Sequence, residues 1–303
     1  MPAKPSNCSP LRLFLWFLLI LTIAAAALTA WLLHWDDQLK LYWQERSVDA
    51  SQRSASIWLP DYELSLQTTL YGLQDDETSG LTWNSATGTL FTVTGQHPQL
   101  VEFSPGGVVL RRITLAGFSD PEAVEALDDG RLAIVDERRR LVAVFRLQPG
   151  VETLDLADLA SYGLGFEGAG NKGFEGLAWN PRTKRMLLAK ERDPQGLFEL
   201  PFPGEEGAAG VLEALPDQPL LVRDISSVAI DPRTGHTLML SDESRLLVEL
   251  DLSGRPRSFI SLLGGLNGLV EGIDQAEGVA MDERGDIYVI AEPNLLYVFS
   301  RKR

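Results

Sequence analysis

The chain has 303 residues, a formal net charge of −15, one cysteine, 45% hydrophobic residues and 23% charged residues. This globular composition excludes a disordered chain. The acidity excludes nucleic acid as a main partner, because phosphate binding requires a basic surface. The lone Cys8 excludes a disulfide framework and any cysteine-rich zinc or iron–sulfur site.

The charge is unevenly distributed along the chain. Residues 1–35 contain two of the 27 basic residues, Lys4 and Arg12, and none of the 42 acidic residues. Residues 36–303 therefore carry 25 bases against 42 acids, a net charge of −17.

The N-terminal part contains a long apolar run. Residues 13–33 have no charged side chain, and about 20 apolar residues suffice for a helix to cross a bilayer. The positive-inside rule predicts a cytoplasmic tail over 1–12, a transmembrane helix over 13–35 and export of the rest. A cleaved signal peptide is the alternative, with small residues at 25–27. The length of the run favours an uncleaved signal anchor in the bacterial inner membrane, with the remaining domain in the periplasm.

A polar segment follows the apolar run, and a segment with the alternating pattern of β-strands follows the polar one. Residues 36–58 end in a serine-rich stretch and are expected to form a stalk or linker. From residue 59 to residue 303, short alternating runs are broken by turn residues, a pattern that predicts an all-β domain.

Five segments of this domain share one template. They read SGLTW from Ser79, EAVEA from Glu122, EGLAW from Glu175, SSVAI from Ser226 and EGVAM from Glu277. Their first residues are 43, 53, 51 and 51 positions apart, and each segment runs into a turn followed by two further strands. Repeats of about 40–50 residues with four strands each predict a β-propeller.

The repeats predict five blades. Fourth strands are expected at Val108–Leu115, at Val151–Leu156, within Val211–Val222 and at Arg257–Leu262, whereas the last repeat ends with three strands. The alternating run Tyr62–Leu70 is expected to complete that blade and close the ring, which removes exposed sheet edges. A sixth blade would require a hidden repeat in 148–173 or 201–223, and neither stretch is long enough.

The repeat sequences resemble a known family. The series SGLTW, DPEAVEALDDGRLAIVDE, KGFEGLAWNP, DISSVAIDPRTGHTLMLSDES and AEGVAMDERGDIYVIAEP is similar to the SdiA-regulated, YjiK-like family of membrane-anchored propellers. The resemblance covers about residues 60–303, with a more distant likeness to NHL repeats and propeller phytases. It implies a five-bladed propeller with a bound calcium ion and carries no established activity.

The heads of the innermost strands form the first candidate site. The first strand of each propeller blade lines the central axis, so Glu122, Glu175 and Glu277 should converge there with Ser79 and Ser226. Converging glutamates need protons, basic partners or a cation, and oxygen ligands suit Ca²⁺. We therefore predict a calcium site from these five residues and Asp224, with Asp120 as a further candidate. In the alternative, the glutamates accept backbone amides of neighbouring blades.

A second set of acids follows the second strands. Glu137, Glu191, Asp242 and Glu292 are expected to cap turns or accept backbone amides, or alternatively to line the rim of the same channel. Residues 163–173 match G-x-G-x-x-G twice, but no strand-to-helix scaffold surrounds them, so we interpret 161–173 as a flexible inter-blade loop.

These features predict calcium-dependent binding of an unidentified ligand or envelope protein, with no catalytic residue assigned. One alternative is a metal-dependent hydrolase of phosphate or carboxylic esters, like phytases or lactonases, for which His97, Lys190 and Arg192 are the available basic side chains. The other alternative is a structural scaffold in an envelope complex. His236 falls in a predicted hairpin turn and is expected to be exposed.

Overall fold

The computed structural model of the chain describes residues 10–32, 35–165, 173–192, 194–202, 210–216 and 220–302. Helices precede the strands: α1 Pro10–Leu32, α2 Trp35–Arg46, α3 Ala50–Ser54 and the 3₁₀ turn η1 Leu59–Asp61. A second 3₁₀ turn, η2, covers Leu156–Asp158. Every described side chain of α1 is exposed to the surroundings or nearly so, and this 23-residue helix is long and apolar enough to cross a membrane.

The rest of the described chain is built of short strands. In chain order they are β1 Tyr62–Thr69, β2 Thr78–Asn84, β3 Thr89–Thr94, β4 Gln99–Phe103, β5 Val109–Ala116, β6 Pro121–Ala126, β7 Leu132–Asp136, β8 Leu141–Phe145, β9 Thr153–Asp155, β10 Ala160–Gly163, β11 Phe174–Asn180, β12 Arg185–Lys190, β13 Gly196–Pro201, β14 Glu213–Ala214, β15 Ser227–Ile230, β16 Thr237–Ser241, β17 Leu246–Leu250, β18 Pro256–Ser261, β19 Ala276–Met281, β20 Ile287–Ala291 and β21 Leu295–Arg301.

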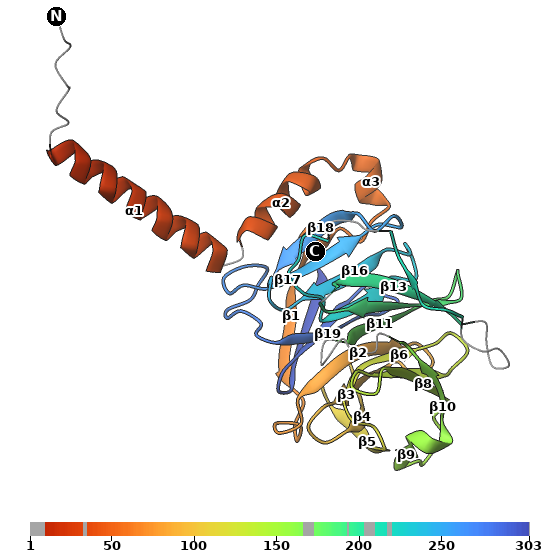
Figure 1. The fold of residues 1–303 in the computed structure, drawn as a ribbon. Coiled ribbons are helices and arrows are strands. Elements are labelled where there is room, and N and C mark those ends of the chain that lie inside the picture. The colour runs from red at the N-terminus through yellow and green to blue at the C-terminus, as the bar shows by residue number, and fades with distance from the viewer. Residues whose placement is uncertain are drawn as a thin grey trace, which may run out of the picture.

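The strands form five sheets arranged as the blades of a propeller (Figure 1), and every strand pair is antiparallel except β5 with β9. Their orders from the axis outward are β2-β3-β4-β5-β9, β6-β7-β8-β10, β11-β12-β13-β14, β15-β16-β17-β18 and β19-β20-β21-β1. The inner strands β2, β6, β11, β15 and β19 each contact the next around the ring, and β19 contacts β2. The predicted five-bladed all-β propeller is therefore confirmed.

The ring is closed by the N-terminal strand. β1 pairs antiparallel with β21, with Tyr62 opposite Arg301 and Thr69 opposite Leu295. The expected contribution of residues 62–70 to the last blade is thus confirmed. The last blade therefore takes its outermost strand from the N-terminal end of the domain. Because this strand closes the ring, its unfolding would also open the ring.

The prediction for the fourth strand of the second blade is wrong. We expected Val151–Leu156 there, but β9 in this segment pairs in parallel with β5 of the first blade, with Leu154 opposite Leu115. The fourth strand of the second blade is β10, which pairs with β8 inside the stretch that we expected to be a loop. Leu154 and Ile113 are both buried in the core between these two blades. The later part of the predicted loop, residues 166–172, lies outside the described residues.

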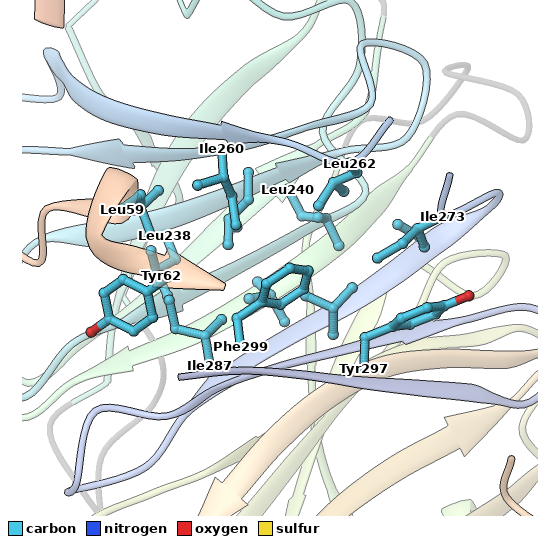
Figure 2. Close-up of a cluster of buried hydrophobic side chains, with 14 of the residues drawn as sticks. Leu59, Tyr62, Leu238, Leu240, Ile260, Leu262, Ile273, Ile287, Tyr297 and Phe299 are labelled. Atoms are coloured by element: carbon cyan, nitrogen blue, oxygen red, sulfur yellow. The ribbon is translucent and has the colours of Figure 1, made fainter. Parts of the chain in front are cut away.

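The core lies between neighbouring blades, and the largest cluster joins the fourth blade, the fifth blade and the N-terminal segment (Figure 2). Leu59, Tyr62 and Phe299 have no exposed surface, and Ile260 of β18 packs in the same cluster. Full burial of an apolar side chain of this size contributes about 1.5–3 kcal/mol to folding. The residues just before β1 are consequently part of the folded domain.

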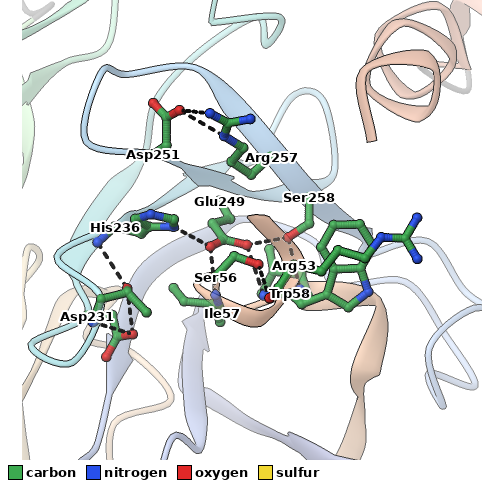
Figure 3. Close-up of polar contacts among 12 residues, drawn as sticks. Arg53, Ser56, Ile57, Trp58, Asp231, His236, Glu249, Asp251, Arg257 and Ser258 are labelled. Carbon is green, nitrogen blue, oxygen red and sulfur yellow. Dashed lines mark hydrogen bonds and ion pairs between the residues drawn. The ribbon is translucent and has the colours of Figure 1, made fainter. Parts of the chain in front are cut away.

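A buried carboxylate attaches this segment to the fourth blade (Figure 3). Glu249 of β17 accepts hydrogen bonds from the backbone amides of Ile57 at 2.7 Å and Trp58 at 3.0 Å, and from the Ser258 hydroxyl at 2.5 Å. The imidazole Nδ1 of His236 lies 2.6 Å from the same carboxylate. The expectation that His236 is exposed is wrong, because this contact holds the ring against Glu249 with 13% of the side chain exposed.

Candidate functional site

Three glutamates lie at the same place in three blades. Glu122, Glu175 and Glu277 are each the second residue of an inner strand, namely β6, β11 and β19. In each of these strands the pairing skips the glutamate, which is therefore the unpaired residue of a β-bulge. A bulge turns the side chain of the extra residue away from the regular alternation. The repeated sequence thus directs three carboxyl groups toward the axis at one end of the ring.

The residue that follows this position allows the inner strands to approach one another. Gly80 has a φ of +59°, and a Cβ there would lie 2.6 Å from the carbonyl oxygen of Glu122. A Cβ on Gly278 would lie 2.8 Å from the backbone carbonyl carbon of Gly80. Glycine therefore permits backbone contact between blades, and this contact explains the glycine that follows Ser79 and Glu277.

The three carboxyl groups are close enough to interact electrostatically. Burial, with repulsion from Asp120, Glu137 and Glu292, raises the pKa of Glu122 to about 8, although a hydrogen bond with Ser79 opposes the shift. Burial raises the pKa of Glu277 to about 8, with further contributions from neighbouring carboxylates that include Glu122. The pKa of Glu175 lies well above its ordinary value because of burial and the charges of Glu191, Glu277 and Glu122.

The acids at the ends of the second strands lie beside these glutamates. Glu137 accepts a hydrogen bond from the amide of Gly173 at 2.5 Å, and Asp242 accepts one from the amide of Ala276 at 3.2 Å. Each bond joins one blade to the next, as expected for acids that bind backbone amides. Burial also raises the pKa of Glu137 and of Glu292, and the nearby carboxylates contribute. We call the end of the ring that carries both sets of acids the acidic face.

One group on the acidic face has the dimensions of a cation site. Asp120, Glu122 and Glu137 each offer a carboxylate oxygen, and these oxygens lie within 4.8 Å of one another. The hairpin of the second blade brings them together, since Pro121 pairs with Asp136 and the amide of Glu137 donates to the carbonyl of Asp120 at 2.9 Å. Asp120 also pairs with Arg138 at 3.0 Å. The predicted ligand set omitted Glu137, although the hairpin between β6 and β7 indicates this neighbour.

The other predicted ligands are engaged with the protein itself. The Ser79 hydroxyl donates to the carbonyl of Glu122 at 2.9 Å, and the Ser226 hydroxyl donates to the carbonyl of Ala276 at 2.6 Å. Asp224 accepts hydrogen bonds from the Ser241 hydroxyl and from the amides of Asp242 at 3.2 Å and Glu243 at 3.1 Å. Burial and the charge of Asp242 raise the pKa of Asp224 to about 6.

The basic side chains considered for hydrolysis are also paired. His97 Nδ1 lies 2.8 Å from the Asp76 carboxylate. Lys190 has no exposed surface, and its amine donates to the backbone carbonyl of Arg192. Arg192 forms ion pairs with Glu191 at 2.6 Å and Glu243 at 2.5 Å.

A family model described as SdiA-regulated matches residues 54–300. Similar solved structures include a gluconolactonase from Xanthomonas campestris, at 15% identity over 83% of this chain and 93% of that chain, with a TM-score of 0.48. A virginiamycin B lyase from Staphylococcus aureus in complex with quinupristin shares 9% identity over 80% of this chain and 100% of that chain, with a TM-score of 0.49. At these identities neither likeness indicates what this chain binds.

Proposed function

The chain belongs to the SdiA-regulated family, and from this premise we propose that it is a membrane-anchored propeller that binds Ca²⁺ at its acidic face and recognises a ligand or envelope partner there. The observation that carries the proposal is the convergence of Glu122, Glu175 and Glu277. Their mutual repulsion and raised pKa values mark a place where a cation would replace protons.

The donor set fits calcium. Asp120, Glu122 and Glu137 supply closely spaced carboxylate oxygens, and Glu175 and Glu277 lie within electrostatic reach of them. Calcium accepts six to eight oxygen ligands with flexible geometry, and carboxylates are its usual protein ligands. A bound cation would neutralise the repulsion between blades and offer positive charge to an anionic group of the ligand.

The contacts support binding ahead of hydrolysis. A metal-dependent hydrolase requires a side chain that activates water or stabilises the leaving group near the metal. The imidazole of His97 faces Asp76, and Lys190 and Arg192 are engaged by the backbone and by glutamates. Hydrolysis of a phosphate or carboxylic ester in the presence of Ca²⁺ would overturn this preference.

Calcium binding is tested by thermal unfolding with Ca²⁺ and with chelator, together with isothermal titration calorimetry. We expect Ca²⁺ to raise the melting temperature, because a ligand at 100 times its Kd adds about 2.7 kcal/mol of stability. Glu175→Gln should lower the affinity and reduce the calcium-dependent gain in melting temperature. Glu63→Gln, on the exposed side of β1, is the matched control. Equal melting temperatures with Ca²⁺ and with chelator would contradict the proposal and favour a scaffold held by protein contacts alone.

The anchor is tested separately. An uncleaved signal anchor predicts protein of full mass in the membrane fraction, released by detergent and not by high salt. A mature N-terminus near Leu28 in a soluble fraction would show that residues 10–32 act as a cleaved signal instead.

A further inference from the structure

The helix α2 has two different faces. On one face Leu41 is 2% exposed, and the helix packs against β18. On the other face Trp35, Leu39 and Trp43 are 50%, 57% and 67% exposed. These residues are spaced four apart and therefore lie along one side of the helix. We call these three side chains the apolar stripe.

The stripe begins immediately beyond the candidate membrane span. α1 ends at Leu32 and α2 begins at Trp35, and Figure 1 shows α2 running in a different direction from α1. A helix of the length of α1 extends about 35 Å, which matches the hydrocarbon core of a bilayer. The end of α1 also contacts the propeller, because Arg223 lies 3.3 Å from the Trp31 carbonyl and its guanidinium lies 5.4 Å from the Trp31 ring centre.

A loop of the propeller extends this surface. Gln38, in the first turns of α2, lies 3.3 Å from the hydroxyl of Ser261 at the end of β18. In the loop that follows Ser261, the exposed fraction is 45% for Leu266 and 87% for Val270. Exposed apolar side chains therefore lie in two elements that meet near the end of the span.

We propose that the apolar stripe and the loop around Val270 rest in the interfacial layer of the phospholipid bilayer, so that the propeller lies directly on the membrane. Tryptophan is enriched at this depth, where the ring contacts both acyl chains and headgroups. The inference rests on the proposed anchor. Because residues 36–303 carry a net charge of −17, attraction to anionic lipids does not supply the contact, and it should persist at high salt.

This arrangement also orients the acidic face. Arg223, which contacts the end of α1, is followed by Asp224, whose charge contributes to the raised pKa of Glu277. The loop after Ser261 leads directly into the head of β19, where Glu277 lies. The end of α1 and the loop after Ser261 therefore lie at the same end of the ring as the acidic face, and the turns after the inner strands, such as that at Ser85, lie at the opposite end.

The test uses the full chain in proteoliposomes. In a Cys8→Ser background, Leu39→Cys, Trp43→Cys and Val270→Cys each receive a spin label, and Ser85→Cys is the control from the exposed turn between β2 and β3. For each spin label we measure the collision rate with oxygen, which partitions into lipid, and the collision rate with a water-soluble nickel chelate. The oxygen-to-nickel ratio should be several-fold higher at the three test positions than at Ser85, in low and in high salt.

The inference would be overturned if the oxygen-to-nickel ratios at all three test positions equalled the ratio at Ser85 while the vesicles contained full-length protein. That result would leave the anchor intact. Label-to-label dipolar coupling that disappears when the protein is diluted with lipid would identify a second copy as the occupant and would also overturn it. Loss of residues 10–32 by cleavage, seen in the intact mass, would instead refute the anchor. Two test positions lie in α2 and one in a separate loop, so misfolding of one variant does not remove the test.

Discussion

The Ser79 hydroxyl donates a hydrogen bond to the backbone carbonyl of Glu122 at 2.9 Å, which joins the inner strand of the first blade to that of the second. Ser226 makes a comparable bond to the carbonyl of Ala276 between the fourth and fifth blades at 2.6 Å. Where two blades lack a glutamate at this position, a short hydroxyl side chain binds the neighbouring backbone. The two side-chain types thus have different roles at one repeat position.

Ser79→Ala should therefore destabilise the fold even in the absence of calcium. Loss of this hydrogen bond to the Glu122 carbonyl should lower the free energy of unfolding by about 1 kcal/mol. Urea unfolding in chelator measures this loss, and calorimetry measures the affinity. Ser85→Ala, in an exposed turn, is the control. A variant with unchanged stability in chelator and weaker calcium binding would show that the hydroxyl is a ligand.

Without calcium, the stability of the propeller should fall as pH rises from about 5 to about 8. The carboxyl groups of Glu122 and Glu277 have a pKa near 8 in the folded chain and an ordinary value of 4.5. The folded chain therefore binds more protons than the unfolded chain between these values, and stability decreases with rising pH. Each such group contributes at most about 1.4 kcal/mol per pH unit.

Melting temperatures across this pH range, in chelator and in saturating Ca²⁺, measure the effect. Glu122→Gln should flatten the profile in chelator, because the amide does not titrate. Saturating Ca²⁺ should weaken the fall, since the cation takes the place of the protons. A melting temperature that rises with pH in chelator would show that ionisation of these carboxyl groups does not destabilise the folded chain.

The sequence predicts the blade count, because the spacing of the five repeats and the turn after each follow directly from local patterns. It does not predict which blade receives a peripheral strand. The alternating run at 151–156 correctly indicates a strand, but its pairing with β5 depends on burial of Leu154 against the first blade. Alternation specifies a strand and one apolar face, and the partner is determined by the packing of distant segments.

The same limit applies to the candidate site. Repeat position places Glu122, Glu175 and Glu277 at the heads of inner strands, and the structure has them there. The proximity of Glu137 to Glu122 depends on the register of a hairpin, and the hydroxyl direction of Ser79 depends on a side-chain rotamer. Neither is encoded in repeat spacing.

Glu249→Ala should detach the segment before β1. The substitution removes the acceptor of the Ile57 and Trp58 amides and leaves them unpaired next to a fully buried core, at an expected cost of about 3 kcal/mol. Urea unfolding measures the loss, and proteolysis between residues 46 and 58 should become faster. Glu243→Ala, a half-exposed glutamate of the same blade, should cost much less. Equal losses in the two variants would show that Glu249 does not hold the segment.

Gly278→Ala should destabilise the contact between the fifth and first blades. The added methyl group would lie 2.5 Å from Cγ2 of Ile290 and 2.8 Å from the backbone of Gly80, so the neighbouring inner strand would have to shift. Overpacking of this kind costs about 1–3 kcal/mol. Gly106→Ala, where the nearest atom would be 3.9 Å away, is the control and should leave the melting temperature unchanged. If Gly278→Ala matched this control, close backbone approach would not explain the glycine that follows the glutamate, and a direct role of its amide in the acidic face would have to be tested instead.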